Sequence, residues 1–387
     1  MTPAARVAAA IEVLDAWLGG APVEKVLTTW GRTHRFAGSK DRAAIRDHVF
    51  DAIRCRRSFA GLGGAETGRG LMLGALRAAG LDPASVFTGE GHAPEALAQD
   101  ETQIGGIANL PEAARLDCPD WLADALRQSL GAEFAPVMAA LRQRAPVFLR
   151  VNVARTTRES AIEALSADGI LARPHDLSPT ALEVMDGARK VQNSAAYQAG
   201  LVELQDAASQ AVVDFLEVPS GARVLDYCAG GGGKSLALAA AGALVTAHDV
   251  DPGRMRDLPA RADRAGAAVA RVSTGEATAG GPYDLVFVDA PCSGSGAWRR
   301  SPEGKWALTP DRLDGLVAVQ ADILDAVASL VAPGGELAYA TCSLLHRENR
   351  DQIDGFLGRW PDWRLVGERR FTPLDGGDGF YVARLTR

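Results

Sequence analysis

This chain has few of the features that mark membrane, secreted or metal-binding proteins. None of its apolar runs approaches the roughly 20 residues that span a bilayer, so we expect no membrane partner. Glu12 and Asp15 interrupt the apolar N-terminal stretch, which argues against a signal peptide. The five cysteines form no Cys-x-x-Cys pair or Cys/His cluster, so we expect no metal. Reduced thiols in a cytoplasmic protein fit this pattern best.

The chain also lacks an overall positive charge. Its formal net charge is −7, which argues against a protein that binds nucleic acid over its whole surface. The charge is uneven, because residues 1–60 carry a net charge of +4 and the remainder carries −11. A nucleic-acid partner would therefore have to bind at local basic patches.

Periodicity divides the 387 residues into three regions. Residues 1–143 carry helical apolar stripes, such as Val7, Ile11 and Leu14, and predict an all-α N-terminal domain. Residues 144–200 mix strand-like and helical stretches and predict a small α+β connector. Residues 201–387 alternate between strands and helices, which predicts an α/β domain with a doubly wound, Rossmann-like parallel sheet.

The predicted strands of this last region are 223–227, 244–249, 268–272, 284–288 and 335–341. The terminal segment DGFYVARLTR is typical of an antiparallel strand at the edge of such a sheet. In doubly wound sheets, ligands bind at the carboxyl ends of the strands. Catalytic and binding residues are therefore expected in the segments that directly follow the predicted strands.

A glycine-rich loop follows the first of these strands. Residues 228–235 read CAGGGGKS, which looks like a phosphate-binding loop. The ATP-type motif needs glycine where Cys228 stands, and the dinucleotide motif fails at Ser235. What remains is a turn that lets the backbone approach a ligand, with Asp249 placed to accept hydrogen bonds from a ribose. These features favour a nucleoside such as S-adenosylmethionine over a tight turn with a chance acidic neighbour.

Two cysteines follow two other predicted strands. Cys292 lies in DAPCSGSG, which begins at Asp289, and Cys342 lies in ATCS. If the two strands are neighbours, both thiols converge on one pocket; otherwise each is an ordinary small buried side chain. A thiol beside a methyl donor suits methylation of a pyrimidine carbon. The thiolate adds to carbon 6, carbon 5 becomes nucleophilic and attacks the methyl group, and loss of the carbon-5 proton permits elimination.

In this order and spacing, CAGGGGKS, DAPCSGSG and ATCS resemble the Sun/Fmu (Nop-type) family of RNA cytosine-5 methyltransferases. FLRVN, RRSPEGKW and DGFYVARL extend the resemblance over residues 146–387. The segment SKDRAAIRDHVFDAIRCRR is similar to the helical NusB-like RNA-binding domain of the bacterial 16S rRNA members. The resemblance implies an enzyme that methylates carbon 5 of a cytosine in RNA, most simply 16S rRNA, with S-adenosylmethionine as donor.

The resemblance also assigns roles to single residues. It implies that Cys342 is the nucleophile, that Cys292 helps to release the product, and that Asp289 contacts the target base and the cofactor region. It places the cofactor against Cys228, Ala229, Gly230, Gly231, Gly232, Gly233 and Lys234, with Asp249 at the ribose and Glu276 near the adenine. The chain departs from the family where CAAPGGK is usual, because Gly230 and Gly231 replace Ala and Pro and remove a φ constraint. It also has Glu276 where the family usually has Asp.

Basic residues in two segments are candidates for RNA contacts. In GAWRRSPEGKW, phosphate contacts are predicted for Arg299, Arg300 and Lys305, with base stacking on Trp298 and Trp306. In the N-terminal region the candidates are Lys40, Arg42 and Arg46. Ordinary solvated surfaces, with the tryptophans in a core, are the alternative. His346 and Glu348, which follow Cys342, are expected on the surface at the start of a helix.

Two other functions remain open at this point. An amino-nitrogen methyltransferase would use Asp-Ala-Pro-Cys as a variant of an acidic-Pro-Pro-aromatic turn, but it would leave Cys342 without a role. A non-catalytic RNA-binding assembly factor would account for Gly230 and Gly231, but not for the two cysteines. We therefore predict a monomeric RNA cytosine-5 methyltransferase.

Overall fold

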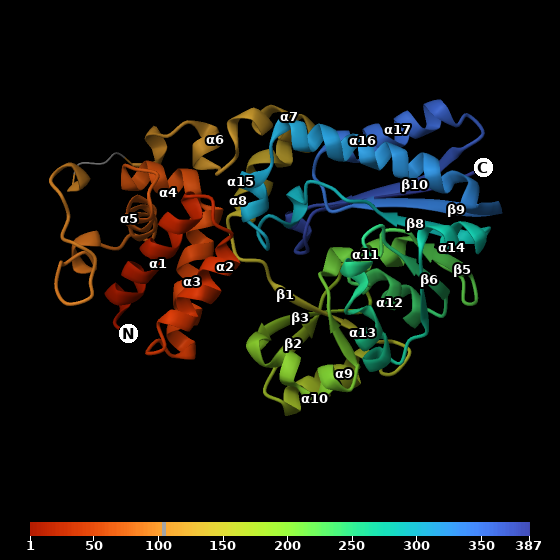
Figure 1. The fold of residues 1–387 in the computed structure, drawn as a ribbon, viewed down its shortest axis with the longest axis horizontal. Helices are drawn as coiled ribbons and strands as arrows, with labels where there is room; N and C mark the ends of the chain where they lie inside the picture. Colours follow the sequence, from red (N-terminus) through yellow and green to blue (C-terminus); the bar gives the residue numbers. More distant parts are fainter. Residues whose placement is uncertain (103–105) are drawn as a thin grey trace. The chain divides into compact units, whose positions relative to one another are not determined.

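The computed structural model describes residues 1–102 and 106–387 (Figure 1). They form two compact units. One contains Met1–Arg144 together with Trp298–Ala307, and the other contains Ala145–Ala297 and Leu308–Arg387. Within the described ranges, no helix is both long and apolar enough to cross a membrane. A ten-residue segment from the middle of the predicted α/β region thus belongs to the helical unit.

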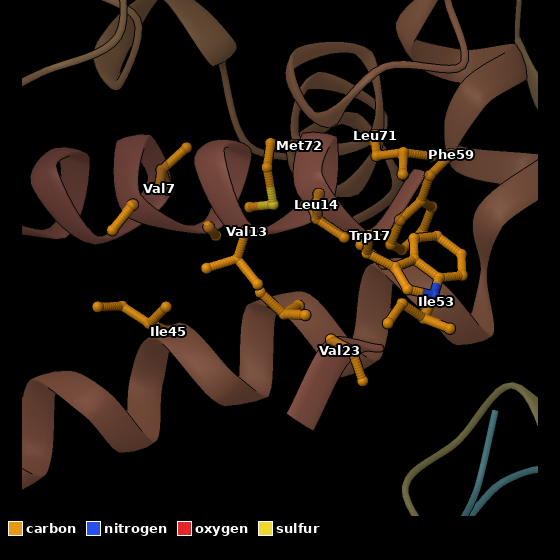
Figure 2. Packing of buried hydrophobic residues seen from close by; sticks show 14 of the residues in the cluster. Val7, Val13, Leu14, Trp17, Val23, Ile45, Ile53, Phe59, Leu71 and Met72 are labelled. Carbon is orange, nitrogen blue, oxygen red and sulfur yellow. The ribbon is translucent and has the colours of Figure 1, made fainter. Parts of the chain in front are cut away.

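The first unit is built from helices. They are α1 (Pro3–Leu18), α2 (Val23–Thr33), α3 (Ser39–Arg54), α4 (Arg56–Gly63), α5 (Gly68–Ala78), α6 (Glu112–Arg115), α7 (Asp120–Leu130), α8 (Phe134–Leu141) and α15 (Glu303–Ala307). The Thr2 hydroxyl accepts from the Ala5 N–H and caps the N-terminus of α1, and Gly19 is the C-cap residue of this helix. Figure 2 shows side chains of α1, α3 and α5 meeting in one buried apolar cluster, which holds these helices together.

The segment Trp298–Ala307 is packed into this helical unit. The Lys305 ammonium donates to the carbonyl oxygen of Arg54 at 2.9 Å, and Arg54 Nε donates to the carbonyl oxygen of Arg299 at 2.7 Å. Trp306 Nε1 donates to the carbonyl oxygen of Ile53 at 2.7 Å. The C-terminal end of α3 is therefore hydrogen-bonded to a segment about 250 residues further along the chain.

This packing contradicts part of the predicted RNA surface. Lys305 and Arg299 are only 1% and 4% exposed, so the prediction that they contact RNA phosphates is wrong. Trp298, at 1%, is a core residue and does not stack on a base. Burial lowers the pKa of Lys305 to about 8. Arg300 is exposed, and its RNA contact stays a prediction.

We expect Lys305→Ala to act on stability and not on RNA recognition. It removes a buried side chain and its hydrogen bond, which should lower the free energy of unfolding by about 2–4 kcal/mol. Urea unfolding measures this loss, and Arg300→Ala, an exposed neighbour, should change the value by less than about 0.5 kcal/mol. If Lys305→Ala had wild-type stability but bound RNA more weakly, Lys305 would after all be an RNA-binding residue.

A small antiparallel sheet opens the second unit. Its strands are β1 (Val147–Val151), β2 (Leu171–Pro174), β3 (Ala181–Asp186) and β4 (Val202–Leu204), in the order β2-β3-β1-β4, with helices α9 (Arg158–Ala167) and α10 (Ala195–Gln198). Asn152, just after β1, donates to the carbonyl oxygens of Gly200 and Ala265 at 3.0 and 2.8 Å. The second of these bonds joins the small sheet to Ala265, the last residue of helix α13 (Leu258–Ala265).

The main sheet has seven strands in the order β10-β11-β9-β8-β5-β6-β7. They are β5 (Arg223–Asp226), β6 (Leu244–His248), β7 (Val269–Val272), β8 (Tyr283–Asp289), β9 (Val331–Thr341), β10 (Arg364–Phe371) and β11 (Phe380–Thr386). The five from β9 to β7 run parallel, and β11 pairs antiparallel with both β9 and β10. The predicted fold class is thus confirmed, but the expectation that the terminal strand lies at the edge is wrong, because β10 covers it.

Helices cover both faces of this sheet (Figure 1). They are α11 (Ala207–Phe215), α12 (Gly233–Ala240), α13 (Leu258–Ala265), α14 (Thr274–Ala279), α16 (Pro310–Val327) and α17 (Arg350–Arg359). One apolar cluster joins the sheet to α14, α16 and α17, and another joins its opposite face to α11 and α12. Because helices cover both faces of the sheet, we expect ligands to bind at the loops that follow the carboxyl ends of the parallel strands.

Candidate active site

The two cysteine-bearing loops follow neighbouring strands. β8 and β9 pair in parallel, with Asp289 opposite Ala340, so the segments that leave them run side by side. Cys292 Sγ and Cys342 Sγ lie 3.4 Å apart, and both residues are half-buried. The structure therefore brings together the two thiols that the sequence placed at strand ends.

Lys234 and Asp289 form an ion pair beside these thiols. Lys234 Nζ donates to Asp289 Oδ2 at 2.6 Å and lies 5.0 Å from the centre of the Phe380 ring. Burial by itself would lower the pKa of Lys234, but Asp289, together with Cys342 and Asp226, raises it overall. The Asp289 side chain is 31% exposed, and its contact with the target base stays a prediction.

The glycine loop is shaped by Asp249. Its carboxylate accepts from the N–H groups of Gly230 and Asp251, both at 3.0 Å, and lies 3.3 Å from the Arg254 guanidinium. Gly230 has φ +52° and Gly232 has φ +76°, in the left-handed region that glycine adopts without strain. The chain therefore has glycine at 230, the position where the family usually has Ala, in a conformation that suits glycine.

Two arginines from outside the loop hold its carbonyl groups. Arg261 of α13 donates to the carbonyl oxygen of Gly231, and Arg150 of β1 donates to that of Gly233 at 2.6 Å. A Cβ atom at position 231 would lie 3.0 Å from the Arg261 guanidinium. Glu203 of β4 in turn lies 3.5 Å from Arg261. Glycine at 231 thus leaves room for the Arg261 guanidinium, which is hydrogen-bonded to the loop.

We expect Arg261→Ala to weaken the binding of S-adenosylmethionine. Loss of its charge-assisted hydrogen bond frees the Gly231 carbonyl, which should cost about 1–3 kcal/mol of binding free energy. Titration calorimetry measures the affinity. Arg256→Ala is the matched control, because the Arg256 side chain is 82% exposed and bonds no loop carbonyl in the described structure. Equal affinities for the two variants would contradict a bracing role for Arg261.

One buried acid at this site was not singled out in the sequence. Asp226, the last residue of β5, is fully buried and accepts from the Ser235 hydroxyl at 2.6 Å. Its other carboxylate oxygen has no hydrogen-bond partner within the described structure. Burial raises the pKa of Asp226 to about 7. The signal available in the sequence was an acidic residue at the end of the predicted strand that leads into the glycine loop.

Glu348 is a second residue that sequence reasoning misplaced. It was expected on the surface, but its side chain is fully buried between the two cysteine loops, so that expectation is wrong. His346 is exposed, as expected. Glu276 caps α14, because its carboxylate accepts from the Ser273 N–H at 2.8 Å and the Ser273 hydroxyl at 2.7 Å. Its contact with adenine stays a prediction.

The predicted basic residues of the helical unit lie on its surface. Lys40, Arg42 and Arg46 are exposed. Arg46 makes a two-pronged ion pair with Glu24, and Arg42 Nε donates to the Ala37 carbonyl oxygen at 3.0 Å. These contacts leave the residues on the exposed side of α3, and their role in RNA binding stays a prediction.

Comparison with known proteins gives matches over most of the chain. A family model described as 16S rRNA methyltransferase RsmB/F matches residues 213–386, and one for the ferredoxin-like domain of RsmF/B-like methyltransferases matches residues 118–192. Ribosomal RNA small subunit methyltransferase B of Vibrio cholerae serotype O1 is 34% identical over 304 residues, which cover 75% of this chain and 70% of that protein. The chain belongs to the 16S rRNA methyltransferase RsmB/F family. It is a methyltransferase that uses S-adenosylmethionine, as the sequence predicted.

Solved structures share the fold of this RsmB/F family member. The crystal structure of PH0851 covers 100% of the chain and 99% of its own length, with a TM-score of 0.78 and 24% identity. A methyltransferase homolog protein from Pyrococcus horikoshii covers 71% of the chain and 97% of its own length, with a TM-score of 0.62 and 23% identity. The resemblance to the Sun/Fmu family is confirmed by the family and relatives matched.

Proposed function

We propose that this RsmB/F family member transfers a methyl group to carbon 5 of a cytosine in 16S rRNA, through a covalent adduct with Cys342. The pair of thiols 3.4 Å apart, beside the ion pair of Lys234 and Asp289, is the observation that carries the proposal. An amino-nitrogen methyltransferase has no use for a second thiol at this distance. A non-catalytic RNA-binding factor has no use for either thiol.

The glycine loop suits the methyl donor. Its turn at Gly230 and Gly232 brings backbone close to a ligand, and the unpaired oxygen of Asp226 lies at the end of the strand that leads into it. Val250, next to Asp249, is 86% exposed and can cover an adenine ring. When bound, S-adenosylmethionine supplies an electrophilic methyl group on sulfur. The residues of this site would hold that group near Cys342.

Each residue of the site then has a chemical task. The target cytosine must leave its stack in the RNA to reach the pocket. The Cys342 thiolate adds to carbon 6, and negative charge develops at N3 of the ring. Asp289, in its protonated form, donates its proton to N3, and the Lys234 ammonium stabilises the carboxylate that remains. Carbon 5 thereby becomes nucleophilic.

Product release reverses the addition. After methylation the carbon-5 proton passes to solvent, its electron pair restores the double bond between carbons 5 and 6, and the Cys342 sulfur departs as a thiolate. Cys292, 3.4 Å away, donates its S–H to this departing thiolate and stabilises it. The basic residues Lys40, Arg42, Arg46 and Arg300 would contact the RNA backbone.

Bisulfite sequencing of ribosomal RNA from a strain lacking the gene tests this function against its parent. We expect one cytosine signal of 16S rRNA to disappear and to return when the gene is restored. Nucleoside analysis of RNA methylated by the purified protein should give 5-methylcytidine. N4-methylcytidine would support the amino-nitrogen alternative, and unchanged signals with no methyl transfer in vitro would contradict the proposal.

A further inference from the structure

A single buried carboxylate joins the two cysteine loops. Glu348 belongs to the short 3-10 helix η9 (His346–Glu348), and its side chain is fully buried. One carboxylate oxygen accepts from the Ser293 N–H at 2.8 Å and from Gln320 Nε2 at 3.1 Å. The other accepts from the hydroxyls of Ser293 and Ser343, both at 2.5 Å. Four donors therefore compensate the burial of this charge.

The positions of these donors connect Glu348 to the chemistry. Ser293 directly follows Cys292, and Ser343 directly follows Cys342. One carboxylate thus binds the residue next to each thiol. The Ser295 hydroxyl strengthens the link, because it lies 3.1 Å from the Ser343 hydroxyl and accepts from the Leu344 N–H at 2.8 Å. This network therefore links the backbone segments that carry the two sulfurs.

The two thiols also face charges of opposite sign. Cys292 Sγ lies 3.4 Å from Cys342 Sγ, and the N–H of the next residue, Ser293, donates to the Glu348 carboxylate at 2.8 Å. The hydrogen bond with Cys342, burial and the charge of Glu348 raise the pKa of Cys292 well above its usual range. Lys234, in contrast, interacts with Cys342.

We propose that Glu348 is a positioning residue that holds the two cysteine loops together and keeps the proton on Cys292, so that the thiolate forms at Cys342. The inference rests on the proposed roles of the two cysteines. When the pair ionises, the Cys342 proton passes to solvent and the retained S–H of Cys292 donates to the new thiolate. Glu348 thereby decides which sulfur attacks the base, although it touches neither substrate nor cofactor.

Glu348→Gln tests the charge with little change of shape. We expect the full-length variant to fold and to bind S-adenosylmethionine with wild-type affinity, but to lose at least tenfold in kcat. The sharper readout is alkylation by iodoacetamide across a pH series, followed by peptide mass mapping of each cysteine. Since only thiolates react, the midpoint for Cys292 should move to lower pH in Glu348→Gln. Glu348→Asp, which keeps the charge, should restore the wild-type midpoint.

Several results would overturn the inference. A wild-type alkylation midpoint of Cys292 in Glu348→Gln would show that the carboxylate does not hold the proton there. If that variant does not fold, Gln320→Met removes one donor to the same carboxylate but leaves its charge. It should lower kcat without moving the Cys292 midpoint to lower pH, and a midpoint at lower pH or an unchanged kcat would overturn the inference. Failure of the proposed function is distinguishable, because the wild-type protein would then methylate no cytosine while the alkylation series still measures the effect of Glu348.

Discussion

Replacement of Cys342 by alanine is expected to abolish methyl transfer to RNA, with a loss of about 10³-fold or more. Without addition of sulfur to carbon 6, carbon 5 of cytosine is too poor a nucleophile to attack a methyl sulfonium. No covalent protein–RNA species should form in this variant. Transfer of labelled methyl groups to RNA, followed by denaturing gel electrophoresis, measures both effects.

Two controls separate chemistry from folding in this experiment. Cys342→Ala should bind S-adenosylmethionine with wild-type affinity in calorimetry, because the glycine loop and its arginines are untouched. Cys118→Ala, a buried cysteine of the helical unit, should retain methyl transfer. Substantial activity in Cys342→Ala would show that Cys342 is not the nucleophile, whatever its distance from Cys292.

The cysteine pair was predictable from sequence for a physical reason. Parallel strands in a doubly wound sheet end at one edge, so two reactive side chains that follow neighbouring strands meet there. Periodicity located β8 and β9, and the residues after each strand were therefore placed correctly. The residues at the carboxyl edge of the sheet could be predicted because their placement depends on two things. One is the local pattern that marks each strand, and the other is the rule that parallel strands end at the same edge.

Glu348 and Lys305 escaped prediction because their environments are made by distant residues. Charged side chains are rarely fully buried, so both were assigned to the surface. Ser293, which binds Glu348, precedes it by 55 residues, and Arg54, which accepts from Lys305, precedes it by 251 residues. Local sequence patterns do not predict hydrogen-bond partners that lie so far apart in the chain. The edge strand β10 was missed for a related reason, since its exposed, charged sequence lacks the alternation of a half-buried strand.

Replacement of Cys292 by alanine should have the opposite signature to the loss of Cys342. Addition to carbon 6 and methylation remain possible, because the Cys342 sulfur and the ion pair of Lys234 and Asp289 are intact. Elimination should slow by about 10²–10⁴-fold, since the departing thiolate loses the S–H donor that lies 3.4 Å from it. The variant should therefore accumulate an RNA adduct that survives a denaturing gel.

Together, the two cysteine variants show which of the two sulfurs attacks carbon 6 of the base. Both thiols lie in the same pocket, so proximity alone would let either one attack the base. We infer that their surroundings break this symmetry, because the hydrogen bond with Cys342, burial and the charge of Glu348 raise the pKa of Cys292. One gel with labelled RNA and S-adenosylmethionine compares the variants, and the double variant Cys292→Ala/Cys342→Ala should show no adduct. An adduct in Cys342→Ala but none in Cys292→Ala would reverse the assignment, and active variants without any adduct would exclude covalent catalysis at this site.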